Sequence, residues 1–173
     1  FYREQLSTPQ AAIGRDFLKG RGFDADSAAH FGVGYAPDEW DALTKVLRAQ
    51  GFTIEELNLA GLVKDGQRGP IDRFRNRLVW PIRDISGDIV GFGARKLADD
   101  DSDQGPKYLN TPETPLYKKS QVLYGLDLAK KEIARKRQAV IVEGYTDVMA
   151  AHLAGVTTAV ATCGTAFGEE HIR

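Results

Sequence analysis

The stretch AVIVEGYTDVMAAHLAGV, residues 139–156, decides the fold of the second part of this chain. It opens with apolar residues typical of a buried strand, passes through Glu143 and Gly144, and continues as a helix-like run. The next apolar run, TTAVATC at 157–163, is typical of a second strand. A strand, a helix and a strand in this order form a β-α-β unit, which predicts a parallel sheet.

Two carboxylates stand where the first of these strands ends. Glu143 occupies its carboxyl end, and Asp147 falls in the first turn of the helix. Ligands of open α/β sheets bind at the carboxyl ends of the strands, so we expect both acids to face one crevice. Oxygen ligands of this kind suit Mg²⁺. The alternatives are that Asp147 only complements the helix dipole and that Glu143 is merely solvated.

One acid does not complete a metal site. Two-metal phosphoryl chemistry needs several carboxylates, and the sequence stops at Arg173 as a third strand would be due. We therefore expect the chain to be a fragment. The remaining metal ligands are expected beyond residue 173 or on another chain.

The middle of the chain is basic although the net charge is -1. Residues 67–97 carry seven basic and three acidic side chains, and residues 104–138 carry eight basic and three acidic ones. A short acidic run at 99–103 separates the two segments. A local basic face matters more for phosphate binding than the total charge, so a phosphate-bearing substrate is expected.

Three arginines alternate in DRFRNR, residues 72–77. If this segment is extended, Arg73, Arg75 and Arg77 share one face, because side chains two apart in a strand point the same way. Guanidinium groups match phosphate oxygens, so the row suits a nucleic-acid backbone or a triphosphate. The alternative is an edge strand that is kept soluble by charge.

A second basic segment, GPKYLNTPETPLYKKS at 105–120, mixes amines, aromatic rings and an amide. Lys107, Tyr108, Asn110 and Lys119 are the candidates in it. Grooves for single-stranded nucleic acid use this combination, since charge follows the backbone and rings stack on bases. A proline-rich loop with buried tyrosines is the alternative.

The first third predicts short helices closed by glycines. In EWDALTKVLRAQG, residues 39–51, Trp40 and Leu43 fall on one apolar stripe. Thr53, with a glutamate three residues later, opens the next helix with a capping-box pattern.

After the helical part, the spacing of the apolar residues changes from that of helices to that of strands. RLVWPI and IVGFGAR, at 77–82 and 89–95, predict a hairpin around DISGD. Gly91 and Gly93 suit a strand that another backbone or a ligand approaches closely. The predicted fold is thus an α+β part at 1–137, helical at 1–66 and basic and β-rich at 67–137, followed by the start of an α/β domain at 138–173.

Several classes are excluded by what the sequence lacks. Its single cysteine, Cys163, excludes an internal disulfide and a Cys-rich zinc site. It has neither a membrane-span pattern nor a signal-peptide pattern, and a cytosolic protein is expected. GFGAR lacks the third glycine of a dinucleotide fingerprint, and no Walker phosphate loop occurs.

Taken together, the motifs GYAPDEW, DRFRNRLVWPIRDISGDIVGFGAR, PKYLNTPET, LYGL and VEGYTDV resemble the polymerase core of bacterial replicative primases of the DnaG type. The resemblance covers essentially the whole chain. It implies that residues 138–173 begin a Toprim domain, truncated after its first β-α-β part. It also implies synthesis of short RNA primers on a single-stranded DNA template.

The resemblance also implies roles for single residues. Glu143 would be a catalytic Mg²⁺ ligand, and Asp147 would support the metal or orient Glu143. Gly144 and Gly164 would shape the turns that border the metals. The basic ridge that guides template and nucleotide is matched by Arg73, Arg75 and Arg77, and the element beside the active site by Lys107, Tyr108, Asn110 and Lys119.

Cofactors and partners follow from the same resemblance. Mg²⁺ is the implied metal, with Mn²⁺ as the alternative, and zinc is implied only in an upstream domain that this chain lacks. The implied partners are single-stranded DNA template, ribonucleoside triphosphates and the RNA–DNA hybrid, with a replicative helicase bound through a further downstream domain and no membrane. The implied location is the bacterial cytoplasm, at the nucleoid during replication, and the fragment alone would be inactive.

Two other functions remain open from the sequence. A Toprim nuclease or topoisomerase would use the same acids for strand cleavage, and a topoisomerase would add a tyrosine nucleophile. A single-stranded DNA-binding module would bind without catalysis.

Overall fold

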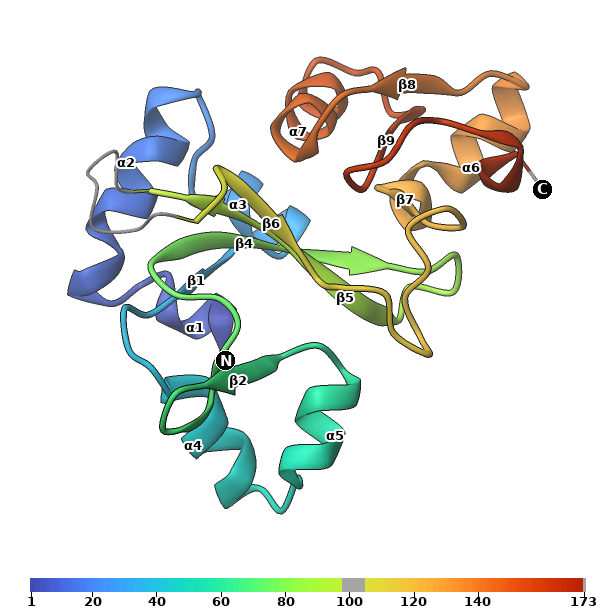
Figure 1. Cartoon of the computed structure of the whole chain (residues 1–173). Helices are drawn as coiled ribbons and strands as arrows, with labels where there is room; N and C mark the ends of the chain where they lie inside the picture. The colour runs from blue at the N-terminus through green and yellow to red at the C-terminus, as the bar shows by residue number, and fades with distance from the viewer. Residues whose placement is uncertain (98–104, 173) are drawn as a thin grey trace.

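The computed structural model describes residues 1–97 and 105–172, so the acidic run at 99–103 lies outside the described residues. The fold is a mixed α/β fold, as predicted, in which a central antiparallel sheet carries helices and a second, smaller sheet lies beside it (Figure 1). The helices are α1 (Tyr2–Gln5), η1 (Pro9–Ala11), α2 (Ala12–Gly20), α3 (Ala25–Phe31), α4 (Ala42–Ala49), α5 (Ile54–Leu59), α6 (Leu126–Lys136), α7 (Tyr145–Leu153) and η2 (Glu169–His171). The strands are β1 (Gly34–Ala36), β2 (Val63–Gly66), β3 (Gly69–Asp72), β4 (Arg77–Arg83), β5 (Ile89–Lys96), β6 (Tyr108–Asn110), β7 (Leu123–Tyr124), β8 (Val140–Val142) and β9 (Ala159–Thr162).

The central sheet has the order β1-β4-β5-β6, and all its neighbours are antiparallel. The predicted hairpin is confirmed as β4–β5. Its turn is closed by Asp84, whose Oδ1 accepts from the backbone N–H groups of Ser86, Gly87 and Asp88 at 2.9 to 3.0 Å. Gly87 has φ +99°, a left-handed conformation that glycine adopts without steric cost.

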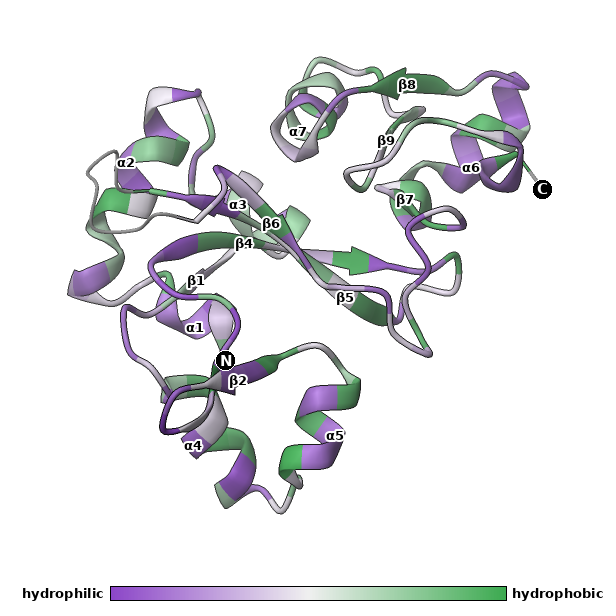
Figure 2. Ribbon diagram, in the orientation of Figure 1, coloured by the Kyte–Doolittle hydropathy of each residue, from purple (hydrophilic) through white to green (hydrophobic). Residues whose placement is uncertain are grey.

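Strand β4 is buried on both faces because helices cover each side of it. Leu78, Trp80 and Ile82 alternate into one hydrophobic cluster with α2, α3 and α7, and Val79 packs into another with α1 and α4. A strand buried on both faces is a continuous apolar run, which is why RLVWPI lacks the polar alternation of a half-exposed strand. Strand β8 of the second sheet is also an apolar run, and Figure 2 shows it in the hydrophobic colour, whereas α6 is largely hydrophilic.

The segment with α4, α5 and the β2–β3 hairpin forms a small lobe at one end of the central sheet (Figure 1). The capping box at Thr53 is confirmed, because Thr53 and Glu56 exchange side-chain and backbone hydrogen bonds. The expectation that Trp40 lies on the apolar stripe of α4 is wrong. The helix begins only at Ala42, and Trp40 is 60% exposed, while Leu43 does pack inward.

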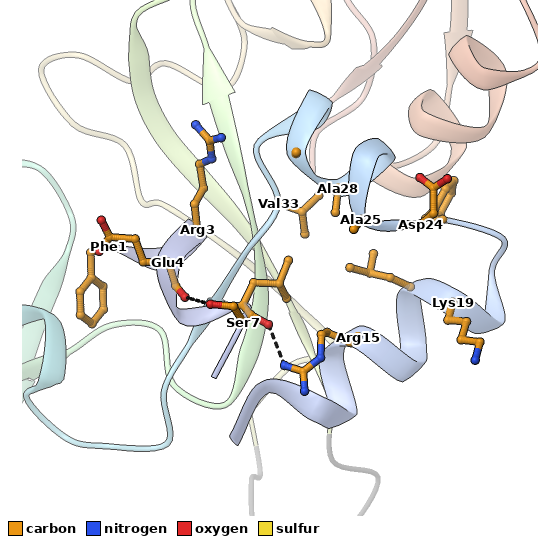
Figure 3. A pocket seen from close by; sticks show the side chains of 14 residues that line it. Phe1, Arg3, Glu4, Ser7, Arg15, Lys19, Asp24, Ala25, Ala28 and Val33 are labelled. Carbon is orange, nitrogen blue, oxygen red and sulfur yellow. Dashed lines mark hydrogen bonds between the residues drawn. The ribbon is translucent and has the colours of Figure 1, made fainter. Parts of the chain in front are cut away.

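Helices α1, α2 and α3 enclose a hollow of about 870 Å³ with an apolar floor and charged side chains at its rim (Figure 3). Arg15 holds the turn between α1 and α2, because its Nη1 donates to the carbonyl oxygens of Leu6 and Thr8 at 2.8 and 2.6 Å. Helix α1 lies against β1, where a Cβ on Gly34 would come within 2.6 Å of the Tyr2 backbone. The absence of a side chain at Gly34 therefore lets α1 pack directly on the sheet.

The second sheet has the order β7-β9-β8. Strands β8 and β9 are parallel and are joined through α7, which confirms the predicted β-α-β unit. Strand β7 pairs antiparallel with β9, so residues before 138 also belong to this sheet. The division of the chain between 137 and 138 stays a prediction. Within the described ranges no helix has the length and apolarity that a bilayer span requires.

Candidate metal and nucleic-acid site

Glu143 directly follows β8 and is exposed to solvent. Its carboxylate makes no hydrogen bond or ion pair with the residues that the structure describes, so it is available to an external ligand. Asp147 is also exposed, and its Oδ2 accepts from the backbone N–H of Gly144 at 3.1 Å. Asp147 thus caps the first turn of α7 and stabilises the turn that carries Glu143.

These two acids are not a complete metal site by themselves. Among residues 1–97 and 105–172, no three His, Cys, Asp or Glu side chains gather closely enough to hold a metal ion. The carboxylate chemistry of Glu143 fits a hard cation such as Mg²⁺, which one or two protein carboxylates usually hold together with water and substrate phosphates.

Tyr145, two residues after Glu143, anchors α7 to the central sheet. Its ring stacks on Trp80 with centroids 5.5 Å apart and an angle of 11° between the planes, and Tyr124 meets it edge-on at 4.8 Å. The ring also occupies the space over Gly93, where an added Cβ would lie only 2.1 Å from the Tyr145 hydroxyl. The close approach expected at this glycine is made by a side chain rather than by another backbone or a ligand.

Asn110, the last residue of β6, joins three segments. Its Oδ1 accepts from the Tyr145 hydroxyl at 2.7 Å. Its backbone carbonyl accepts from Nε and Nη2 of Arg73 at 3.2 and 2.8 Å. Its Nδ2 lies against Gly164, where a Cβ would come within 2.9 Å of it. The structure therefore brings the predicted residues Arg73 and Asn110 next to the turn that carries Glu143.

The expected row of three arginines on one strand face is not formed. The segment between β3 and β4 is not a strand, and Asn76 within it has φ +47°. Arg77 is 3% exposed and donates to the Pro106 carbonyl at 2.8 Å. Burial and the neighbouring charge of Arg77 lower the pKa of Arg73. Arg73 and Arg77 are thus partly or wholly enclosed by the protein, whereas Arg75 points elsewhere.

Arg75 and Trp40 form a stacked pair. The guanidinium carbon of Arg75 lies 3.4 Å from the Trp40 ring centroid, and Asp38 lies 3.9 Å from the same guanidinium. An indole that is 60% exposed and carries a cation on one face is suited to stack on nucleic-acid bases. The sequence interpretation missed Trp40, because apolar periodicity placed it in a helix. The signal that could have found it was the acidic, proline-containing PDEW start, which is a turn rather than a helix interior.

The remaining candidates lie along β6 and the loop after it. Lys107 and Tyr108 are exposed at the start of β6. The backbone N–H of Lys119 donates to a carboxylate oxygen of Glu113 at 3.0 Å, and its carbonyl oxygen lies 3.0 Å from Nε2 of His171. Lys119 is therefore held between the loop and the end of the second sheet.

A buried aromatic cluster lies beneath this surface. Cys163, Tyr117 and Tyr145 are all buried, and burial raises the pKa of the Cys163 thiol to about 11. Burial likewise raises the pKa of the Tyr145 phenol well above its ordinary value. Both groups stay protonated at neutral pH, so neither is an activated nucleophile.

Two family models match the chain. The model of the N-terminal domain of the DNA primase catalytic core matches residues 1–130, and the Toprim domain model matches residues 137–173.

Two bacterial DNA primases are similar to this chain over its whole length. A DNA primase of Streptomyces coelicolor is 68% identical over 174 residues, which cover 100% of this chain and 27% of that protein. A DNA primase of Mycolicibacterium smegmatis is 64% identical over 172 residues, or 99% of this chain and 27% of that protein. The chain therefore spans about a quarter of the length of these relatives.

Solved structures agree with the fold. The RNA polymerase domain of Mycobacterium tuberculosis primase DnaG, in complex with a double-stranded DNA oligomer with a 6-nucleotide overhang, is 60% identical with a TM-score of 0.95. That match covers 99% of this chain and 53% of the other. A DnaG primase catalytic domain bound to single-stranded DNA is 39% identical with a TM-score of 0.85, and the match covers 99% of this chain and 53% of the other.

Proposed function

Because this chain belongs to the DNA primase family, we propose that it is part of an enzyme that copies single-stranded DNA into short RNA primers for replication. The chain supplies the first part of the catalytic core and the first β-α-β unit of the Toprim domain. The observation that carries the proposal is Glu143, whose exposed carboxylate lies at the end of a parallel strand and pairs with none of the described residues. Tyr145, two residues later, is linked through Asn110 to the basic segment at Arg73.

Glu143 is the proposed ligand of Mg²⁺, with Mn²⁺ as the alternative, and Asp147 holds the turn on which Glu143 stands. Bound divalent ions supply activation of a ribonucleotide 3'-hydroxyl and neutralisation of the phosphates. The other metal ligands are proposed to lie beyond residue 173, and the 173 residues alone are proposed to be inactive.

Template and nucleotide are bound by the basic and aromatic side chains. Arg73 is half-buried and lies beside the charge of the buried Arg77, so a phosphate that contacts Arg73 would be stabilised by both charges. Lys107 and Tyr108 are exposed at the start of β6, Asn110 is its last residue, and Lys119 lies in the loop that follows. We assign Arg73, Arg75, Lys107, Tyr108 and Lys119 to direct binding of nucleic acid or triphosphate. Arg77 and Asn110 support that binding from within the protein, Arg77 through its charge and Asn110 through the carbonyl oxygen that holds Arg73.

The Trp40–Arg75 pair adds a stacking platform for template bases. Its geometry supports a contact that does not depend on base identity, since every base has a face that can stack on indole. Contacts to phosphate make binding fall with rising salt, whereas the stacking contribution is much less sensitive to salt.

The Toprim nuclease or topoisomerase alternative is disfavoured by the first 130 residues, which match the primase core and not only the shared Toprim module. The buried and protonated phenol of Tyr145 also lacks the accessibility that a strand-cleaving tyrosine needs.

The wider setting belongs to the same proposal. The enzyme would act in the bacterial cytoplasm at the nucleoid, with ribonucleoside triphosphates, the RNA–DNA hybrid and a replicative helicase as partners. The helicase contact and a zinc site would reside in domains outside these 173 residues.

A hybrid enzyme tests the chemistry. Residues 1–173 replace the matching segment of the Streptomyces coelicolor DNA primase, whose 68% identity over 174 residues favours the exchange. We expect the hybrid to make RNA primers on single-stranded DNA, and Glu143→Gln to lower synthesis by at least about a thousandfold while DNA affinity changes less than about twofold, since only a metal ligand is lost.

The matched variant is Trp40→Ala, which removes an exposed ring and no acid. It should weaken DNA binding by about 1–3 kcal/mol, the usual contribution of one stacked base, and spare synthesis at saturating template. Primer synthesis by Glu143→Gln at the wild-type rate, or nicking of DNA in place of synthesis, would contradict the assignment.

A further inference from the structure

We propose that Asn110 and Tyr145 form a positioning pair that sets the turn carrying Glu143 against the segment carrying Arg73. This inference rests on the proposed function, because it gives the pair its task in the active site. Neither side chain is proposed to touch the reacting atoms. The pair acts by fixing the turn that carries Glu143, after β8, relative to Arg73, in the segment between β3 and β4.

Three residues fix the position of the Tyr145 ring. Trp80 stacks on its ring, Tyr124 meets it edge-on, and Gly93 leaves the space that it fills. The hydroxyl donates to Oδ1 of Asn110, 2.7 Å away, and it also interacts with the buried Cys163 thiol. Because the ring alone already supplies the packing, the hydroxyl contributes orientation more than burial.

Asn110 is engaged from the opposite side. Two nitrogen atoms of Arg73 donate to its carbonyl oxygen, so a shift of β6 at this residue moves the arginine with it. Gly164, with φ +75°, brings the loop after β9 against Nδ2 of the same side chain. One residue thus contacts the basic segment and both loops at the carboxyl ends of the parallel strands.

The position of Tyr145 in the chain transmits this contact to the metal ligand. Tyr145 begins α7, and Glu143 lies two residues before it. Asp147, in the same turn of α7, bonds back to the N–H of Gly144. The turn at Glu143 and Gly144 is short, and the bonds of Asp147 and Tyr145 fix the helix start that follows it. The direction of the Glu143 carboxylate therefore depends on the position of Tyr145.

The test uses the hybrid primase that carries residues 1–173, with the variants Tyr145→Phe, Asn110→Ala and both together. Tyr145→Phe keeps the ring, and Asn110→Ala keeps the carbonyl that Arg73 binds. We expect each single variant to lower kcat for primer synthesis about tenfold, with KM for nucleotide and the Kd for DNA within about twofold. The double variant should be no slower than the slower single one, since both changes remove one bond.

Tyr2→Phe is the matched control. Tyr2 is buried like Tyr145, but its hydroxyl has no hydrogen-bond partner among the described residues. It is the first residue of α1, far along the chain from Glu143. Tyr2→Phe should therefore leave kcat unchanged.

A purely structural role of the pair predicts a different result. The melting temperatures of Tyr145→Phe and Asn110→Ala would fall in step with their activity, and the activity would return on cooling. That result, multiplicative losses in the double variant, or unchanged kcat would overturn the proposal. If the hybrid makes no primers at all, the proposed function is contradicted instead. If Asn110→Ala weakens DNA binding tenfold, Asn110 is a ligand-binding residue and the positioning role is overturned.

Discussion

Cys163 follows β9 and is completely buried among aromatic side chains. Burial raises the pKa of its thiol to about 11. Because the thiolate is the reactive form, the folded protein at pH 8 holds only about 0.1% of this residue in a reactive state. Burial then blocks even that small fraction from reagents in solution.

We expect Ellman's reagent to modify Cys163 at pH 8 only when the chain is unfolded in urea. The raised pKa means that folding favours the protonated thiol, so this contribution to stability is complete below the unfolded pKa, near 9.0, and is lost as the pH rises towards 11. Absorbance of the released thiol measures the reaction, and Cys163→Ala gives the blank. Rapid modification of the native chain would contradict the burial.

At the scale of single residues, the sequence predicted what strand ends and helix starts dictate locally. The strand end at Glu143 and the first helical turn at Asp147 lie where the apolar run and the helix start predict them. The hydrogen bond from the Gly144 N–H to Asp147 was not predicted, and the roles of both acids at a metal stay predictions. The arginine row failed because alternation requires a strand, and Asn76 breaks the segment with a left-handed backbone. Whether Arg73, Arg75 and Arg77 bind nucleic acid stays a prediction.

Among the elements, α4 depends on a residue from another strand. Asp72, at the end of β3, accepts at 2.8 Å from the backbone N–H of Leu43, and from the N–H and hydroxyl of Thr44 at 3.0 and 2.5 Å. Its own N–H donates to the Trp40 carbonyl at 2.7 Å. Asp41, the local N-cap residue, makes no capping hydrogen bond, so Asp72 satisfies the start of the helix in its place.

Asp72→Ala should lower the free energy of unfolding by about 2–4 kcal/mol, because three buried donors lose their acceptor. Asp41→Ala is the control, since its ion pair with Lys45 is exposed and should cost less than about 0.5 kcal/mol. Urea denaturation followed by circular dichroism measures both. Equal losses in the two variants would show that the helix start is capped locally after all.

Element prediction succeeded where periodicity is local and strong. The β4–β5 hairpin and the β8–α7–β9 unit follow from apolar runs and from the turn residues between them. Strand β7 has two residues, too few for any period, and its pairing with β9 is a tertiary event. The cap of α4 by Asp72 was equally hidden, because the two segments lie 28 residues or more apart in the sequence.

For the molecule as a whole, α7 provides one of the junctions between the two sheets. Trp80 of β4 stacks on Tyr145, and its Nε1 donates to the sulfur of Met149 at 3.2 Å. Gly93 on the next strand leaves room for the tyrosine. The glycine signalled a close approach in the sequence, but its partner is a side chain 52 positions later in the numbering, which no local pattern identifies.

Gly93→Ala tests this junction, because its new methyl would overlap the Tyr145 ring, whose own environment is closely packed. We expect the free energy of unfolding to fall by about 2–4 kcal/mol, the range for overpacking combined with partial loss of the aromatic contacts. Gly20→Ala, in α2 with nothing within 4 Å of the new methyl, should instead be neutral or stabilise by up to about 1 kcal/mol.

A double-mutant cycle separates the junction from a local strain in β5. In the Tyr145→Ala background the space over residue 93 is empty, so Gly93→Ala should then cost less than about 1 kcal/mol, and the coupling energy should exceed about 1 kcal/mol. Urea denaturation supplies all four free energies. If Gly93→Ala costs the same in both backgrounds, the glycine serves the strand itself, and α7 is held to the central sheet by the Trp80 stack without it.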